Sequence, residues 1–369
     1  DGGGSITLNA SKMDLAGIVG VFAETQGESP AGTLTLKPDN NKPNLDLTLA
    51  PGAKISASTS AGGKGGDLIV NAPEAINISG AGKLAVETTG AGDAGNIEIG
   101  TQKLTLSDGV QISASTESSG KAGNINLKVG ENINLAGRET GIFASTTQGS
   151  TGESGNIIID PKIMTIEDGA EIAVDSQGEN IGGDIDLTAG LLTLDNGTIS
   201  AETRNNDGGN IQLNLQDWLL LRNGSQITTT AGNEEFGGNG GNINIDSPFI
   251  IAVPQEDSDI TANAFRGDGG NVDITIQGLF GITFQEQPRI GKSDITASSQ
   301  FGVNGNVNIS ILEVDPAKDL VELPVNLVDA ANQISTACTP GGSQFQNEFV
   351  VTGRGGLPMS PTEPLQESN

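Results

Sequence analysis

Residues 95–124 read GNIEIGTQKLTLSDGVQISASTESSGKAGN, and this stretch is one period of a pattern that fills most of the chain. Each period opens with an anchor glycine, a polar residue and a short alternating apolar stretch, which is G-N-I-x-[I/L] in the clearest copies. The anchor glycines are Gly4, Gly32, Gly66, Gly95, Gly123, Gly155, Gly183, Gly209, Gly241, Gly270 and Gly305. Their mean spacing is about 30 residues. Such a fixed period predicts a solenoid, in which each repeat, here called a coil, buries its apolar face only against its neighbours.

Three apolar pairs recur within a coil. In the quoted coil they are Ile97/Ile99, Leu104/Leu106 and Ile112/Ala114, and a polar residue separates the two members of each pair. Alternation with a period of two, bounded by Gly, Asn and Asp, indicates β-strands with one face turned inward. Successive pairs, counted into the next coil, begin 7, 8 and 13 residues apart, which predicts two tight corners and one loose corner.

These patterns predict an all-β fold, a right-handed parallel β-helix (solenoid) of about eleven three-strand coils over residues 1–311. A non-repeat C-terminal cap and Pro/Gly-rich tail are expected over residues 312–369. Right-handed winding is expected because connections between parallel strands of one sheet are right-handed in nearly all proteins. A stack of strands has two open edges, so end-to-end self-association is a further expectation.

The polar residue after the anchor glycine is most often Asn. The seven copies are Asn96, Asn124, Asn156, Asn210, Asn242, Asn271 and Asn306. Asp67 and Asp184 take the same position. Stacked Asn side chains can pass amide hydrogen bonds from one strand to the next, as in cross-β ladders. We therefore interpret these residues as a structural ladder rather than as a binding site.

The amino-acid composition restricts the classes of molecule that this protein could bind. The net charge is −28 with only 18 Lys and Arg, which argues against nucleic acid and against an anionic membrane surface. No apolar run approaches the roughly 20 residues of a membrane-spanning helix. No signal peptide is visible, and the chain opens at Asp1 inside a repeat, so we expect its targeting segment to lie upstream. The single cysteine, Cys338, cannot form an internal disulfide and is interpreted as a free thiol.

The chemistry of the side chains argues against an enzyme. The chain has no His and no Tyr, which excludes Ser-His-Asp and Cys-His nucleophile systems and imidazole metal sites. No catalytic residue, no cofactor and no metal site is therefore predicted. A carboxylate pair among the 46 Asp and Glu residues could still act on a glycosidic bond, which keeps a polysaccharide hydrolase or lyase as an alternative. Residues 62–70 match one calcium-binding nonapeptide, but calcium rolls need that nonapeptide in tandem.

Three corners depart from the minimal coil and are the candidates for binding. Residues 37–44 enlarge the first corner of an early coil and include two prolines. The second corner swells in two successive late coils, at 254–259 and 285–294. Successive coils place the same corner side by side, so a mixed-charge binding surface is predicted there. Its residues are Glu256, Asp257, Asp259, Glu286, Arg289, Lys292 and Asp294.

The segment beyond the repeats has a distinctive amino-acid sequence. It includes Asp315-Pro316, the stretch LVELP at 320–324, VDAANQI at 328–334, Cys338 and FVVTGRGGLP at 349–358. Together with the repeats, this segment resembles the C-terminal region of cyanobacterial filamentous haemagglutinin-like exoproteins of the two-partner secretion class. The resemblance implies a right-handed β-helix, export through an outer-membrane partner pore by way of an N-terminal secretion domain that this sequence lacks, and a secreted, extracellular or cell-surface location.

The sequence thus predicts a secreted or surface-displayed adhesin-like rod that contacts cell-surface glycans or polysaccharide without chemistry of its own. Two alternatives stay open. One is the carboxylate-dependent polysaccharide hydrolase or lyase, and the other is a purely structural extracellular spacer.

Overall fold

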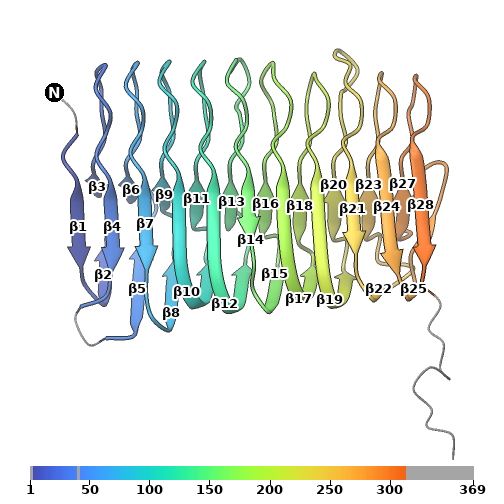
Figure 1. The fold of residues 1–369 in the computed structure, drawn as a ribbon, viewed down its shortest axis with the longest axis horizontal. Helices are drawn as coiled ribbons and strands as arrows, with labels where there is room; N and C mark the ends of the chain where they lie inside the picture. Colours follow the sequence, from blue (N-terminus) through green and yellow to red (C-terminus); the bar gives the residue numbers. More distant parts are fainter. Residues whose placement is uncertain (1–2, 40–41, 313–369) are drawn as a thin grey trace, which may run out of the picture. The chain divides into compact units, whose positions relative to one another are not determined.

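The solenoid predicted from the repeats is present in the structure, a computed structural model that describes residues 3–39 and 42–312 (Figure 1). Every regular element in these residues is a β-strand, and the strands stack in parallel from coil to coil. The chain descends along the front strands, passes behind and returns upward while it advances, which is a right-handed path (Figure 1). The predicted cap and tail at 312–369, with Cys338 and the distinctive segment, lie outside the described residues apart from Leu312.

Three faces can be followed along the stack. The first face contains β1 (Ile6–Asn9), β4 (Leu34–Lys37), β7 (Leu68–Asn71), β14 (Ile157–Ile159), β21 (Ile243–Asp246), β24 (Asn271–Ile276) and β28 (Asn306–Ile311). The second face contains β2 (Lys12–Leu15), β5 (Asn44–Leu49), β8 (Ala75–Ser79), β15 (Ile163–Glu167), β22 (Phe249–Ala252) and β25 (Gly278–Phe280). The third face contains β3 (Gly20–Phe22), β6 (Lys54–Ser56), β9 (Lys83–Ala85), β11 (Gln111–Ser113), β13 (Gly141–Phe143), β16 (Glu171–Ala173), β18 (Thr198–Ser200), β20 (Gln226–Thr228), β23 (Asp259–Thr261) and β27 (Asp294–Thr296).

The first two faces join into one 17-stranded sheet, which the sequence did not predict. Four strands run through the corner between them: β10 (Ile97–Ser107), β12 (Ile125–Ala136), β17 (Ile185–Asp195) and β19 (Ile211–Arg222). The β10–β12 pairing shifts register between Thr101 and Lys103, so the extra corner residue is absorbed as a β-bulge. The expectation of three separate strands in every coil is therefore wrong for these coils, because the first corner is a bend within a strand.

The core is a column of aliphatic side chains inside the coils. All six members of the three apolar pairs in the quoted coil are fully buried, from Ile97 to Ala114, and the same positions in the other coils are buried with few exceptions. The apolar residues that alternate in the sequence therefore face the interior of the coils, as expected. At the first coil the equivalent residues, such as Ile6 and Leu8, are only partly buried because they have a neighbour on one side.

The anchor glycines are required by the close stacking of the coils. A Cβ atom at Gly123 would overlap the carbonyl oxygen of Gly95 in the preceding coil, and each anchor from Gly32 to Gly305 meets a glycine carbonyl in the same way. The first anchor, Gly4, has open space at this position because no coil precedes it among the described residues. The repeated glycine is thus a consequence of coil-to-coil contact rather than of turn flexibility.

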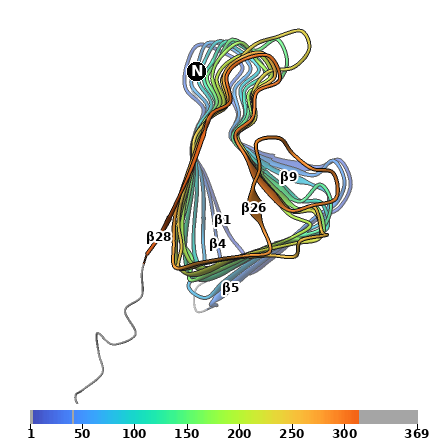
Figure 2. The same cartoon turned by 90° about the vertical axis from the view of Figure 1, so that its right-hand side faces the viewer.

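A loop projects from every coil through a narrow neck between the third and the first face (Figure 2). This loop is the loose corner predicted from the spacing. Buried threonines close its neck: the Oγ1 atoms of Thr59, Thr88 and Thr116 each donate to the carbonyl oxygen four residues later, at 2.6 Å. These threonines also form bridges to one another from coil to coil. Each of these three loops is therefore held closed by its own hydroxyl group, whereas Ala231 and Ala264 take the same bridging position in two late coils.

The chain adds a strand to the end of the third face just before the last enlarged corner at 285–294. The short strand β26 (Thr283–Phe284) pairs in parallel with β27, with Thr283 opposite Asp294 and Phe284 opposite Ile295. The N–H of Gln285 also donates to the carbonyl oxygen of Ile295, at 3.0 Å. In the resulting 11-stranded sheet, β26 forms one edge and β3 the other. The strand β26 and Gln285, the first residue of the insertion, therefore cover the edge of the last full strand of the third face.

Candidate functional site

The late corners that the sequence singled out form an internally paired network. Glu256 turns back to the preceding coil, where its carboxylate accepts hydrogen bonds from Arg222 Nε at 2.7 Å and Arg222 Nη2 at 2.9 Å. Asp257 Oδ1 accepts the N–H of Lys292 at 3.0 Å. The charge of Glu256 is therefore offset by an arginine that the sequence did not assign to this group.

The remaining members of this group surround Asp294. Its side chain is 1% exposed and accepts hydrogen bonds from Arg289, while its own N–H donates to Asp259 Oδ1 at 2.9 Å. Burial, followed by the nearby charges of Asp257 and Asp294, raises the pKa of Asp259 to about 6. Glu286 lies on the exposed part of the insertion. The structure thus brings most of the predicted binding residues together, and their mutual pairing holds the insertion against the rod. A binding role for them stays a prediction.

The residues after the anchor glycines form hydrogen bonds along the first face. The Oδ1 atom of Asn96 accepts the backbone N–H of Asn124 at 3.0 Å, and Asn124 Oδ1 accepts that of Asn156 at 2.8 Å. Side-chain amide bonds join later members, as from Asn242 Nδ2 to Asn210 Oδ1 at 2.9 Å and from Asn271 Nδ2 to Asn242 Oδ1 at 2.9 Å. Asp67 and Asp184 accept in the same way, and Asn306 donates its backbone N–H to Gly270. Backbone N–H groups thus take part in the bonding, as well as the side-chain amides.

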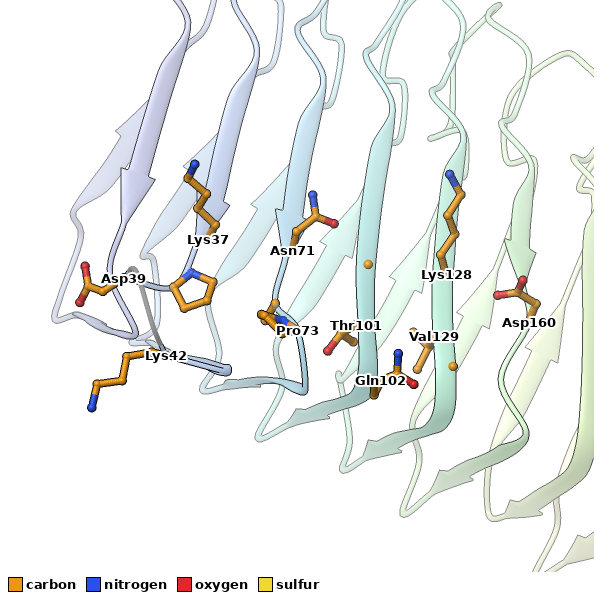
Figure 3. Close-up of a pocket in the computed structure, with 14 residues that line it drawn as sticks. Lys37, Asp39, Lys42, Asn71, Pro73, Thr101, Gln102, Lys128, Val129 and Asp160 are labelled. Carbon is orange, nitrogen blue, oxygen red and sulfur yellow. The ribbon is translucent and has the colours of Figure 1, made fainter.

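A long groove follows the corner between the first and second faces, across five successive coils (Figure 3). It has a volume of about 820 Å³. Its floor is made of small or buried residues, among them Ala72, Thr101 and Val129, together with Gly100 and Gly130. Pro38 and Lys42, from the enlarged first corner at 37–44, form the N-terminal end. The small residues leave the corner hollow.

The rim of this groove carries polar groups from one coil after another. Lys37, Asn71, Gln102, Lys128 and Asp160 are all exposed, and they succeed one another along the rod (Figure 3). Lys128 Nζ lies 2.6 Å from Glu98 Oε1, so its charge is partly offset. The rim therefore combines ammonium and amide donors with amide and carboxylate acceptors. Because strands are about 4.8 Å apart, such groups recur at that spacing along the groove.

The lining of this groove was only partly predicted. The enlarged corner at 37–44 was recognised from its prolines, but Asn71, Gln102, Lys128 and Asp160 were not. Polar residues at tight corners are ordinary in any β-helix, and nothing in one repeat marks these four. The signal lies in their register, because they share a corner in successive coils.

A second group of interest is acidic and lies on the third face. Glu171, Asp175 and Glu202 are half-buried close to one another, with Ser200 donating to Asp175 and Thr228 to Glu202. Burial, then the charges of Asp175 and Glu202, raises the pKa of Glu171 to about 7. In earlier coils the position of Glu171 is taken by Lys54 and Lys83, which pair with Glu87 at 3.5 and 2.9 Å. The late coils thus carry acidic residues where the early coils carry balanced pairs.

The raised pKa of Glu171 predicts a pH-dependent stability. Its ordinary value is 4.5, so between about pH 4.5 and pH 7 the folded state holds more of its proton than the unfolded chain does. The free energy of unfolding should therefore fall as the pH rises through this window. Glu171→Gln removes the ionisation, so the variant should match the wild type at pH 4 and exceed it at pH 8 by on the order of 1–2 kcal/mol.

Urea unfolding followed by circular dichroism at both pH values measures this difference. Glu117→Gln, a change of an exposed glutamate in a projecting loop, is the matched control and should show no such dependence. An equal stability of Glu171→Gln and wild type at pH 8 would contradict the prediction.

Within 3–39 and 42–312, no three His, Cys, Asp or Glu side chains gather in a group that could hold a metal ion. In that same part of the chain, no helix has the length and apolar character needed to cross a membrane.

Comparisons of the chain with known protein families, with curated proteins and with solved structures find no match.

Proposed function

We propose that this protein is a secreted or surface-displayed adhesin-like rod that binds polysaccharide in the corner groove, without catalysis. The observation that carries the proposal is the length of the groove, which spans five coils and so offers equivalent positions to successive units of a polymer. A small molecule would occupy only one or two of these positions. The resemblance of residues 315–358 to two-partner secreted exoproteins supports the extracellular location and the outer-membrane partner pore.

The chemistry of the rim supports a sugar polymer as the ligand. Sugar hydroxyl groups both donate and accept hydrogen bonds, and the rim supplies both partners through Asn71, Gln102 and Asp160. Lys37, Lys42 and Lys128 add donors without a large excess of positive charge, because Asp39 and Asp160 lie in the same groove and Glu98 pairs with Lys128. A strongly anionic polymer such as nucleic acid would instead need a dense basic surface. A hydroxyl-rich chain therefore fits the rim best.

The double variant Asn71→Ala/Gln102→Ala tests the groove. Both side chains are exposed, so the fold should be retained, and the loss of hydrogen bonds from two positions should weaken polysaccharide binding by roughly tenfold. Co-sedimentation of the purified protein with extracellular polysaccharide measures the binding. Gln148→Ala/Gln177→Ala removes two exposed amides from the projecting loops and is the matched control. Equal binding by both double variants would refute the groove as the site.

The same experiment addresses the enzymatic alternative. Glu171, with its pKa raised to about 7 beside two other carboxylates, is the described residue best suited to act as a general acid. Release of new sugar ends by the wild type, abolished in Glu171→Gln, would replace the adhesin proposal by a hydrolase or lyase. If the protein neither binds the polysaccharide nor releases sugar ends, the structural spacer would be favoured.

A further inference from the structure

A second groove continues the line of the first along the same corner. It has a volume of about 370 Å³. Its lining residues come from several coils, of which Thr188 is the first in the sequence and Leu312 the last. Asp160 closes the first groove and Thr188 opens the second. These two residues occupy the same position in adjacent coils, because each directly follows the paired residues Ile159 and Leu187. The two grooves therefore abut, and together they follow one corner along most of the described rod.

The sheet face beside the second groove is apolar, unlike the same face elsewhere. One line of outward positions on the second face runs through Ile163, Leu191, Trp218 and Phe249, which pair in register from coil to coil. Trp218 is 39% exposed and Phe249 38%. The parallel line two residues further on is polar in the early coils and becomes apolar at the end. Its members are Asp46, Asn77, Thr105, Asn134, Thr165, Thr193, Leu220, Ile251 and Phe280.

Aromatic residues are scarce in this chain, which makes their placement informative. There are ten Phe and one Trp in 369 residues, and the single Trp and two of the Phe lie on this surface. The rings of Phe249 and Phe280 have centroids 6.4 Å apart. Trp218 and Phe249 are direct partners across the β19–β22 pairing. We name the surface formed by Trp218, Leu220, Phe249, Ile251 and Phe280 the aromatic strip.

We infer that the aromatic strip and the second groove form a continuation of the glycan site, which takes an uncharged polysaccharide with a flat, apolar ring face. Aromatic rings pack against the C–H face of a sugar, while amides beside them bind the hydroxyl groups at its edge. Asn214, Gln216 and Gln277 line the groove along the border of the strip. This inference rests on the proposed function, and it names the class of polymer that the site selects.

The charges around the second groove support an uncharged ligand. Asp246 is among its lining residues, and no Lys or Arg is among them. A polymer rich in carboxylate or sulfate groups would meet this acidic residue and the overall negative charge of the chain. A second copy of the protein could cover the apolar strip but would leave the adjoining row of amides without a comparable role. A flat neutral sugar chain uses both surfaces.

Because Trp218 is the only tryptophan, its fluorescence reports directly on the strip. Titration of the protein with cellohexaose, a soluble neutral β-linked oligosaccharide, should shift the emission of Trp218, whereas an oligogalacturonate of equal length should not. Phe249→Ala keeps the reporter and should weaken cellohexaose binding by roughly five- to tenfold. Phe22→Ala removes another exposed phenylalanine, on β3, and should bind like the wild type.

The outcomes distinguish a failure of this inference from a failure of the proposed polysaccharide binding in the first groove. Unchanged emission with cellohexaose, while the Asn71→Ala/Gln102→Ala variant still loses polysaccharide binding, would overturn the aromatic strip as a sugar site and leave the first groove in place. Equal binding of cellohexaose and oligogalacturonate would overturn the stated ligand class. A ligand-free dimer that Trp218→Ala dissociates, seen by sedimentation velocity, would assign the strip to self-association instead.

Discussion

Replacement of Gly123 by Ala is expected to lower the free energy of unfolding by about 2–4 kcal/mol, although it adds a single methyl group. The added Cβ would overlap the carbonyl oxygen of Gly95 and would also approach the Cβ of Ala114, which belongs to the same preceding coil. A carbonyl oxygen belongs to the backbone and cannot rotate away, so relief requires that the two coils separate. Separation would stretch the inter-coil hydrogen bonds on every face of that coil.

Gly4→Ala is the matched control for this change. Gly4 opens the first coil with the same sequence motif, but a Cβ there meets nothing within 4 Å. Chemical unfolding followed by circular dichroism should therefore show a midpoint close to wild type for Gly4→Ala and a clearly lower midpoint for Gly123→Ala. Similar midpoints for the two variants would mean that the anchor glycine serves the turn itself rather than the contact between coils.

Loss of the strand β26 is expected to convert the protein into end-to-end oligomers. β26 covers the outer edge of β27 at one end of the third-face sheet, and β3 forms the opposite edge. Gln285→Pro removes the N–H that donates to Ile295 and introduces a ring that disfavours strand pairing at this position. The freed edge of β27 can then pair with β3 of another molecule, and such head-to-tail contact does not close on itself.

Sedimentation velocity over a range of protein concentrations measures this association. Gln285→Ala removes the same side chain but keeps the N–H, so it should sediment as the wild type does. Gln285→Pro should show a mass that increases with concentration. A Gln285→Pro protein that sediments like Gln285→Ala at every concentration would show that β26 does not protect the edge.

Much of the fold follows from the sequence because a solenoid repeats its constraints. The alternation of Ile97, Ile99, Leu104 and Leu106 specifies an inward face, and the recurrence of the same pattern specifies stacking. The joining of two strands into β10 could not be predicted, because a β-bulge near Thr101 preserves the alternation on both sides of the bend. The buried threonines of the loop necks were also missed, since no apolar pattern marks Thr88 as buried.

The candidate sites were less predictable than the fold. Insertions are visible in one sequence, which is why residues 37–44 and 285–294 were recognised. A groove or an aromatic strip depends instead on which residues of different coils share a position. Trp218 and Phe249 are a full period apart, and only the register of β19 and β22 places them together. An error of one residue in that register would have turned one of them toward the core.

The stacking of coils has a mechanical consequence for a protein held between two surfaces. The hydrogen bonds that join β10 to β12, and each coil to the next, point along the rod, so tension on the chain ends opens them one coil at a time from an end. Each detached coil of about 30 residues can extend to roughly 100 Å, about twenty times the length it occupied in the stack. Under load the rod would lengthen in steps and dissipate work at each one, while the coils that remain stacked keep their grooves intact.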